Sequence, residues 1–296
     1  GGWALRKQFV GRATDDHFGW SVAILDSLLA VGAPFEDNGV IKDQGAVTLF
    51  SRSGITDWSY HQTLTANDGA GYDNFGQSVA ISNHRVLVGA PGRGGSTGAA
   101  YVFDPPPIQF GAWAQSAKLN ASDALPGDKF GYSVAIYANT ALVGAQRETI
   151  TPPSRRQAAY VFVTPNASGG TWSQQARLLL GERAPTYPVS VALSYNIAVV
   201  GMSGETIAGS SPEGTAYVFT RSGEVWTLRQ QIVASDGQEA DGFGVSVAID
   251  GDAIMVGAPQ AGSAGQGAVY VLKNNCGAAL ARIANGAAAS NENLKQ

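Results

Sequence analysis

The chain has 296 residues, 38 glycines and 14% charged side chains, with a formal net charge of −4. A nucleic-acid-binding protein needs a basic surface to neutralise phosphates, so this balance argues against a nucleic-acid partner. No apolar run approaches the roughly 20 residues of a membrane-spanning helix, and we expect no membrane insertion. The single cysteine, Cys276, excludes an internal disulfide framework.

The dominant feature is a sequence pattern that occurs five times. Each copy opens with Phe-Gly-x-Ser-Val-Ala-Ile or a worn form of it, at Phe18, Phe75, Phe130, Tyr187 and Phe243. A Val-Gly pair follows, with its glycine 14 residues after the opener (18 to 32, 75 to 89), and a segment such as AAYVF at 99–103 closes the copy. The openers lie 57, 55, 57 and 56 residues apart. Such a period, carried by β-branched and aromatic residues, predicts the blades of a β-propeller.

A fourth segment, WxxxxxL, heads each copy. Its tryptophans are Trp3, Trp58, Trp113, Trp172 and Trp226, and the apolar residues six positions later are Phe9, Leu64, Leu119, Leu178 and Ile232. We predict that this segment is the outermost strand of each blade. One tryptophan per blade at a fixed position indicates packing rather than a sugar-binding platform.

The two ends of the chain carry complementary parts of the pattern. The chain begins with a fourth strand, Trp3–Gly11, and the last copy holds only strands one to three, Phe243–Leu272. We therefore predict an all-β, five-bladed propeller of four-stranded blades over residues 1–272, closed by pairing of the N-terminal strand into the last blade. Residues 273–296 are expected to be a tail or linker with a short helix at Ala278–Ile283.

The first strand of each blade has one bulky and one small face. In the second copy Phe75, Val79 and Ile81 face one way, whereas Gly76 and Ser78 face the other. The small face predicts a close approach between neighbouring sheets.

The pairs FGQSVAI with LVGAP and FGVSVAI with MVGAP resemble the FG-GAP repeat of integrin α-subunit propellers and many secreted proteins. The resemblance covers residues 3–272 and implies an adhesion or recognition domain that binds through one propeller face. In that family the turn between strands one and two carries an Asp-rich calcium site. Here these turns are as short as Asn83-His84 and contain no D-x-D-x-D-G run, so we expect no calcium site in them.

Paired aspartates recur in the loop that leads from strand four into the next strand one. They are Asp68 and Asp73, Asp123 and Asp128, and Asp236 and Asp241, and Asp16 fills the second position in the first copy. Two carboxylates in one loop could bind a hard cation, or they could accept backbone N–H bonds in an Asx-type turn. Recurrence in several blades favours the structural interpretation. We expect no cofactor and regard the six paired aspartates as weak calcium candidates.

The loops from strand two to strand three should share an edge of the propeller with the acidic loops, and they vary most in sequence. One of them, Gln146–Gln157, contains three arginines, whose planar forks suit carboxylates and sulfates. The expected partner is therefore a protein or an acidic glycan, although a merely solvated loop explains the same residues. The candidate ligand-binding residues are Arg147, Glu148, Arg155, Arg156, Arg93, Glu36 and Asp37.

Two Asn-x-Ser sequons, at Asn166 and Asn120, are candidate N-glycosylation sites on an extracellular protein. Asn166 lies in a predicted loop, and Asn120 is close to the end of a predicted strand.

Three classes of function follow. The first is a non-catalytic recognition or adhesion module, extracellular or at the cell surface. The second is a structural subunit that self-assembles into a fibre or surface layer. The third, a propeller glycosidase, needs two carboxylates over a central pocket, but the five predicted inner strands contain none. The histidines His17, His61 and His84 fall at unrelated positions of the repeat, so neither a triad nor a metal cluster is visible. We therefore do not expect an enzyme.

Overall fold

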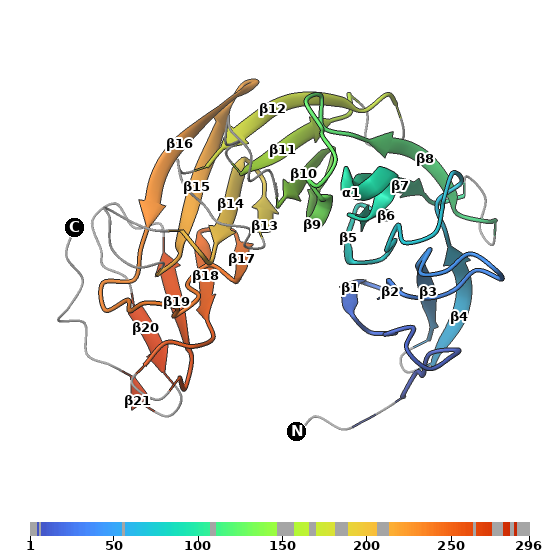
Figure 1. Cartoon of the computed structure of the whole chain (residues 1–296), viewed down its shortest axis with the longest axis horizontal. Coiled ribbons are helices and arrows are strands. Elements are labelled where there is room, and N and C mark those ends of the chain that lie inside the picture. The colour runs from blue at the N-terminus through green and yellow to red at the C-terminus, as the bar shows by residue number, and fades with distance from the viewer. Residues whose placement is uncertain are drawn as a thin grey trace. The chain divides into compact units, whose positions relative to one another are not determined.

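The computed structural model is built almost entirely from β-strands (Figure 1). It describes every residue except 1–4, 6, 55–56, 107–110, 147–156, 166–169, 181–188, 206–212, 263–264, 274–280, 285–286 and 289–296. In this described part the one helix, α1 (Arg93–Ser96), has four residues, and no helix is long and apolar enough to cross a membrane.

Consecutive strands pair antiparallel into five sheets, in the orders β1-β2-β3-β4, β5-β6-β7-β8, β9-β10-β11-β12, β13-β14-β15-β16 and β17-β18-β19-β20-β21. The first two sheets contain β1 (Ser21–Leu25), β2 (Leu28–Ala33), β3 (Ala46–Ser53), β4 (Asp57–Leu64), β5 (Ser78–Ser82), β6 (Arg85–Ala90), β7 (Ala99–Asp104) and β8 (Ala114–Leu119). The next two contain β9 (Phe130–Tyr137), β10 (Thr140–Ala145), β11 (Ala158–Val163), β12 (Ser173–Leu179), β13 (Val189–Ser194), β14 (Ile197–Met202), β15 (Thr215–Ser222) and β16 (Val225–Ile232). The last contains β17 (Ser246–Asp250), β18 (Ala253–Ala258), β19 (Ala268–Lys273), β20 (Ala281–Ala284) and β21 (Ala287–Ala288).

Five successive antiparallel meanders of this kind are the blades of a β-propeller. The predicted fold class, an all-β five-bladed propeller, is therefore confirmed. The chain divides into two compact units, Gly1–Asn139 with Thr164–Trp172, and Thr140–Val163 with Ser173–Gln296.

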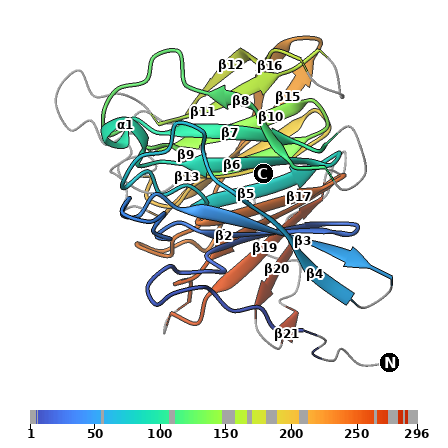
Figure 2. The ribbon, with the colours of Figure 1, turned by 90° about the vertical axis from the view of Figure 1, so that its right-hand side faces the viewer.

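The core of the first unit lies between its first two sheets. Val79 and Ile81 of β5 pack against a buried cluster that includes Leu49 of β3 and both Phe75 and Tyr101 of the second repeat. Figure 2 shows β5, β6 and β7 running side by side, with β2 and β3 beneath them. The bulky face of one inner strand therefore covers the preceding sheet, as the alternation of large and small residues predicted.

Serine and glycine of the repeated motif join three of the inner strands to the next repeat. The serine hydroxyl donates to the carbonyl of the Phe-Gly glycine in the following copy: Ser21 to Gly76 (2.8 Å), Ser78 to Gly131 (3.0 Å) and Ser190 to Gly244 (2.8 Å). A Cβ atom on Gly89, the glycine of a Val-Gly pair, would lie 1.9 Å from the Gly131 carbonyl oxygen. No side chain fits there, and the predicted close approach is confirmed.

The described residues of the N-terminal segment form no strand, contrary to the prediction that Trp3–Gly11 is the fourth strand of the last blade. Trp3 lies outside the described residues, and Leu5 and Lys7–Gly11, which are described, form no strand. Instead, the ring of Phe9 lies 3.9 Å from that of Phe50 in β3, and Lys7 Nζ donates to the carbonyl of Trp58 (2.6 Å). Contacts with the first sheet therefore hold this segment.

The outer edge of β19 is taken by β20, from the region expected to be a tail. Ile283 pairs with Val269, the register in which Leu119 faces Ala100 and Ile232 faces Ala216. Because an apolar residue fills the same position opposite strand three, Ala281–Ala284 acts as the fourth strand of this sheet. The helix predicted over Ala278–Ile283 is wrong for the described residues Ala281–Ile283, which are extended.

Candidate functional site

Loops of two kinds meet at one end of the sheets, as predicted. The loop that follows strand two in one repeat hydrogen-bonds, through its carbonyl oxygens, to the loop that enters strand one of the next. The donor and acceptor pairs are Tyr72 N to Lys42 O, Phe75 N to Gln44 O, Lys129 N to Ser96 O, Phe130 N to Thr97 O and Phe243 N to Glu213 O. These bonds join the loops of the first three repeats within one unit and those of the last two repeats within the other. We call the loops at this end of the sheets the loop rim.

The second aspartate of each acidic loop has a structural role. Its Oδ2 accepts the backbone N–H of the residue three positions earlier, at 2.8–2.9 Å: Asp16 from Ala13, Asp73 from Ala70, Asp128 from Leu125 and Asp241 from Gln238. All four aspartates are buried. This is the Asx-type turn of the structural interpretation, and it shapes the loop just before the Phe-Gly pair.

The first aspartate binds a tyrosine of strand three. Tyr101 OH donates to Asp68 at 3.0 Å, and Tyr270 OH donates to Asp236 at 2.9 Å. A buried hydroxyl needs such a partner. The first repeat has neither member of the pair, because Gly11 stands at the aspartate position and Thr48 at the tyrosine position.

The fourth repeat keeps the tyrosine but takes its acid from another loop. Its acidic pair is missing from the sequence, and Tyr217 OH instead donates to Glu205, 2.6 Å away, in the loop after β14. Glu205 is only 5% exposed. Burial raises the pKa of this carboxyl, while the Tyr217 hydrogen bond opposes the shift.

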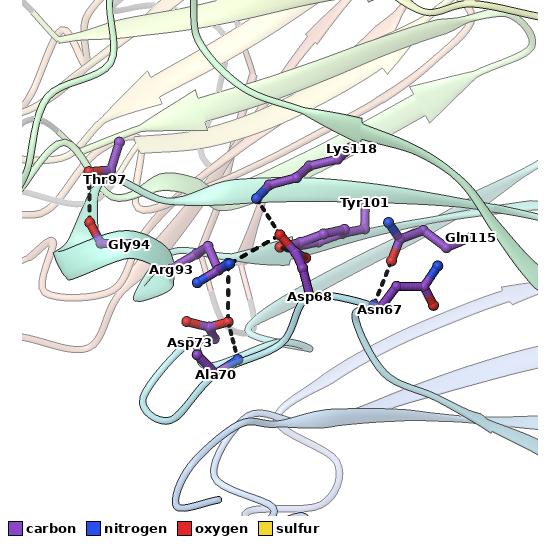
Figure 3. Close-up of polar contacts among 10 residues, drawn as sticks. All are labelled: Asn67, Asp68, Ala70, Asp73, Arg93, Gly94, Thr97, Tyr101, Gln115 and Lys118. Atoms are coloured by element: carbon purple, nitrogen blue, oxygen red, sulfur yellow. Dashed lines mark hydrogen bonds and ion pairs between the residues drawn. The ribbon is translucent and has the colours of Figure 1, made fainter.

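Among the described residues of the loop rim, charged side chains gather around Asp68 (Figure 3). Arg93 of α1 and Lys118 of β8 contact its Oδ2 at 3.1 and 2.7 Å, and Arg93 Nε also lies 3.5 Å from Asp73 Oδ2. Although burial opposes it, hydrogen bonds from Lys118, Arg93 and Tyr101 lower the pKa of Asp68 well below its ordinary value. Burial raises the pKa of Asp73, despite the Ala70 N–H and Arg93.

This arrangement leaves little role for a bound cation at Asp68 and Asp73. The protein's own guanidinium and ammonium groups already neutralise the carboxylates, and a metal ion would have to displace them. In the described part of the chain no group of three or more His, Cys, Asp or Glu side chains is placed to hold a metal. Of the other weak calcium candidates, Asp236 is bound by Tyr270, Asp128 and Asp241 by backbone N–H groups, and Asp123 is half-buried.

Chelation should therefore leave the thermal stability of the protein unchanged. We expect the same melting temperature by circular dichroism with and without EDTA, because the acidic loops are closed by internal hydrogen bonds and ion pairs. Calcium and magnesium added back separately serve as controls. A fall of many degrees in EDTA that calcium alone reverses would show that the acidic loops bind the ion after all.

The candidate ligand-binding residues have different surroundings. Arg93 belongs to the Asp68 cluster. Glu36 is buried, 3.4 Å from Arg12, and burial raises its pKa despite that arginine. Asp37 binds Lys42 and accepts the N–H of Asp43 at 3.0 Å. Arg147, Glu148, Arg155 and Arg156 lie outside the described residues, as does Asn166, whereas Asn120 is exposed directly after β8.

Sequence reasoning missed an aromatic cluster on the loop rim of the first repeat. Trp20 is 52% exposed, its ring stacks on that of His17 (centroids 5.6 Å apart, 8° between planes), and Phe35 meets both rings edge-on, 5.9 Å from Trp20 and 4.9 Å from His17. The signal was available: Trp20 is the one tryptophan that does not head a strand four. In contrast, the four described strand-four tryptophans pack, with Trp113 buried and arginines lying over Trp58, Trp172 and Trp226.

The repeats can be compared with known sequences. The FG-GAP repeat family matches residues 11–50, 58–103, 113–162 and 226–272, which together make up more than half of the chain. The fourth repeat, with its worn opener at Tyr187, lies outside these stretches. No curated protein matches the sequence. With its motif glycines and serines joining successive sheets of a β-propeller, the chain belongs to the FG-GAP repeat family.

Proposed function

We propose that this FG-GAP propeller is a non-catalytic extracellular recognition module that binds a protein or an acidic glycan through the loop rim. The family is generally non-catalytic, and its fold supports binding or recognition. The observation that carries the proposal is the loop rim itself. Loops of different sequence are held side by side by backbone hydrogen bonds on a rigid β-scaffold, which is how binding surfaces are commonly built.

We infer that an acidic ligand contacts the arginine-rich segment 147–156, because other cations of the rim are already neutralised by carboxylates. Four cations of the rim, Arg12, Arg93, Lys42 and Lys118, are paired with carboxylates. An acidic ligand would have to break these pairs to use them. The segment 147–156 brings three arginines against one glutamate, and so supplies positive charge in excess. Paired N–H donation by arginine suits carboxylates and sulfates.

Replacing Arg147, Arg155 and Arg156 together by Ser should abolish binding of acidic ligands without unfolding the protein. Exposed loop changes usually alter stability by within about 0.5 kcal/mol. Binding of the parent to immobilised heparin and to polyglutamate should weaken with added salt, because exposed charges are screened. The measurement is surface plasmon resonance at several salt concentrations.

A matched control removes the same charge elsewhere. Arg52, Arg229 and Lys273 are exposed strand residues, and their triple replacement by Ser should leave binding intact. Equal losses in both triple variants would indicate unspecific charge attraction. Unchanged binding after the loop substitution would exclude the arginine-rich segment as the contact.

A further inference from the structure

We propose that His17, Trp20 and Phe35 form a saccharide platform, on which the exposed face of the Trp20 indole stacks against the apolar face of one neutral pyranose ring. This site lies in the first repeat and uses none of the arginines of the third, so it extends the proposed recognition function with a second site and a different ligand class. Either proposal can fail without the other.

The geometry holds Trp20 ready for stacking. The residue precedes β1, and its backbone N–H donates to the His17 carbonyl at 3.0 Å, while Gly19 N–H donates to Gly32 at 3.0 Å. The imidazole covers part of one side of the indole, and the Phe35 ring stands perpendicular to it with the ring centroids 5.9 Å apart. Thus about half of a large apolar side chain is exposed and yet fixed, and a ligand would bind without first ordering it.

The three aromatic residues occur together in one repeat alone. Trp20 fills the variable position of Phe-Gly-x-Ser, where the other copies have Gln77, Tyr132, Val189 and Val245. The position of His17 is held by Asn74, Lys129, Thr186 and Gly242, and that of Phe35 by Gly92, Arg147, Gly204 and Gln260. The propeller therefore does not need aromatic residues at these positions. His17, Trp20 and Phe35 depart from the repeat at three positions, and their rings contact one another. This indicates a function specific to the first repeat.

Polar groups around the platform match the hydroxyls of a sugar. Asp15, two residues before His17 in the chain, is exposed, and the 60% exposed Arg12 side chain contacts Glu36, the residue that follows Phe35. Carboxylates accept and guanidinium groups donate, and a sugar hydroxyl does both. A site lined by aromatic rings with a few polar groups suits a ligand that has one apolar face and a polar edge.

The charge around the platform excludes the acidic ligands of the arginine-rich loop. Asp15, Asp16, Glu36 and Asp37 are opposed by Arg12 and Lys42. The local balance is negative, so uronic acids and sulfated sugars would be repelled. A neutral pyranose meets no such penalty.

The test follows the indole directly. In protein with ¹⁵N-labelled tryptophan, the Trp20 Nε1–H resonance is assigned as the signal missing from Trp20→Phe. We expect neutral monosaccharides and short oligosaccharides of glucose, galactose, mannose and N-acetylglucosamine to shift this resonance selectively. Calorimetry with the best of these sugars should then show at least a tenfold weaker Kd for Trp20→Ala and a smaller loss for Trp20→Phe, which keeps an aromatic face.

Tyr132→Ala is the matched control, because Tyr132 occupies the same position in the third repeat and donates its backbone N–H in the same way, to Lys129. It should bind the sugar as the parent does. Circular dichroism melts check that each variant is folded, and the resonance of the parent protein gives a readout that no substitution affects. The proposal is overturned if no neutral sugar shifts the Trp20 resonance, if Tyr132→Ala loses as much affinity, or if only proteins bind there, over Trp20 and the exposed Val22 and Ile24 of β1.

Discussion

Gly89→Ala should be among the most damaging single substitutions in this protein. The added Cβ would lie 1.9 Å from the Gly131 carbonyl oxygen and 2.4 Å from Ser78 Oγ, which donates to that same oxygen. Both neighbours are tightly held, one of them being backbone, so the second and third repeats must move apart. Overpacking of this kind costs on the order of 3 kcal/mol. We expect a melting temperature lower by roughly 10 °C.

Gly54→Ala separates steric exclusion from backbone strain. Gly54 has φ +69°, but a Cβ there would meet nothing within 4 Å. Its replacement by Ala should destabilise the protein only by the cost of holding an alanine in the left-handed backbone conformation, about 1 kcal/mol. Urea denaturation of both variants decides the matter. Comparable losses in the two would mean that close approach between repeats is not what the motif glycine provides.

Tyr217→Phe should be the second most destabilising change, and it should act through Glu205. Removing the hydroxyl leaves a buried carboxyl without the donor that is 2.6 Å away, a loss of about 2 kcal/mol. Tyr101→Phe is the matched control at the same repeat position. Asp68 keeps its contacts with Arg93 and Lys118, so that loss should be about 1 kcal/mol or less. Equal losses of stability in Tyr217→Phe and Tyr101→Phe would mean that burial of the carboxyl at Glu205 adds nothing to the cost of removing the hydroxyl.

The pH dependence of Tyr217→Phe provides a second readout. Because burial raises the pKa of Glu205 above its ordinary 4.5, the folded protein holds this proton at pH values where the unfolded chain has released it. Stability therefore falls as the pH rises from 4.5 to the raised pKa, and stays level above it. Without the Tyr217 hydroxyl, which lowers this pKa, the fall should be larger and reach higher pH. Melting temperatures of parent and variant between pH 4 and 8 measure the difference, and parallel curves would contradict this role for Glu205.

Much of the fold could be predicted because the same residue types recur at the same positions in five copies of the repeat. Gly recurs where a β-carbon would collide with the next repeat, Ser where a hydroxyl reaches that repeat, and Phe where the ring is buried in the core. The fourth strand of the last sheet could not be predicted in the same way. Ala281–Ala284 has no tryptophan and matches the other fourth strands mainly through Ile283, and a single apolar residue is a weak sequence signal.

The contacts of the loop rim were harder to predict than the fold. The acidic loops could be interpreted as structural from their recurrence, and the hydrogen bonds of Asp16, Asp73, Asp128 and Asp241 agree. The pairing of Arg93 with Asp68 joins residues that sequence reasoning had placed in separate sites, because contacts between loops of one rim depend on side-chain reach. Glu205 was missed for a related reason: its partner Tyr217 belongs to the repeat, but the glutamate does not.

In the fourth repeat the tyrosine of strand three binds Glu205 in place of an aspartate before strand one, and this changes which part of the repeat can vary in sequence. In the second and fifth repeats the loop before strand one must keep an aspartate in place for the tyrosine, and insertions or deletions there would leave a hydroxyl unsatisfied. In the fourth repeat that duty has passed to Glu205, and the sequence from Leu180 to Tyr187 is released from it. New segments could be grafted into this stretch of sequence without removing the acid that Tyr217 binds, which makes it the natural place to engineer a new specificity.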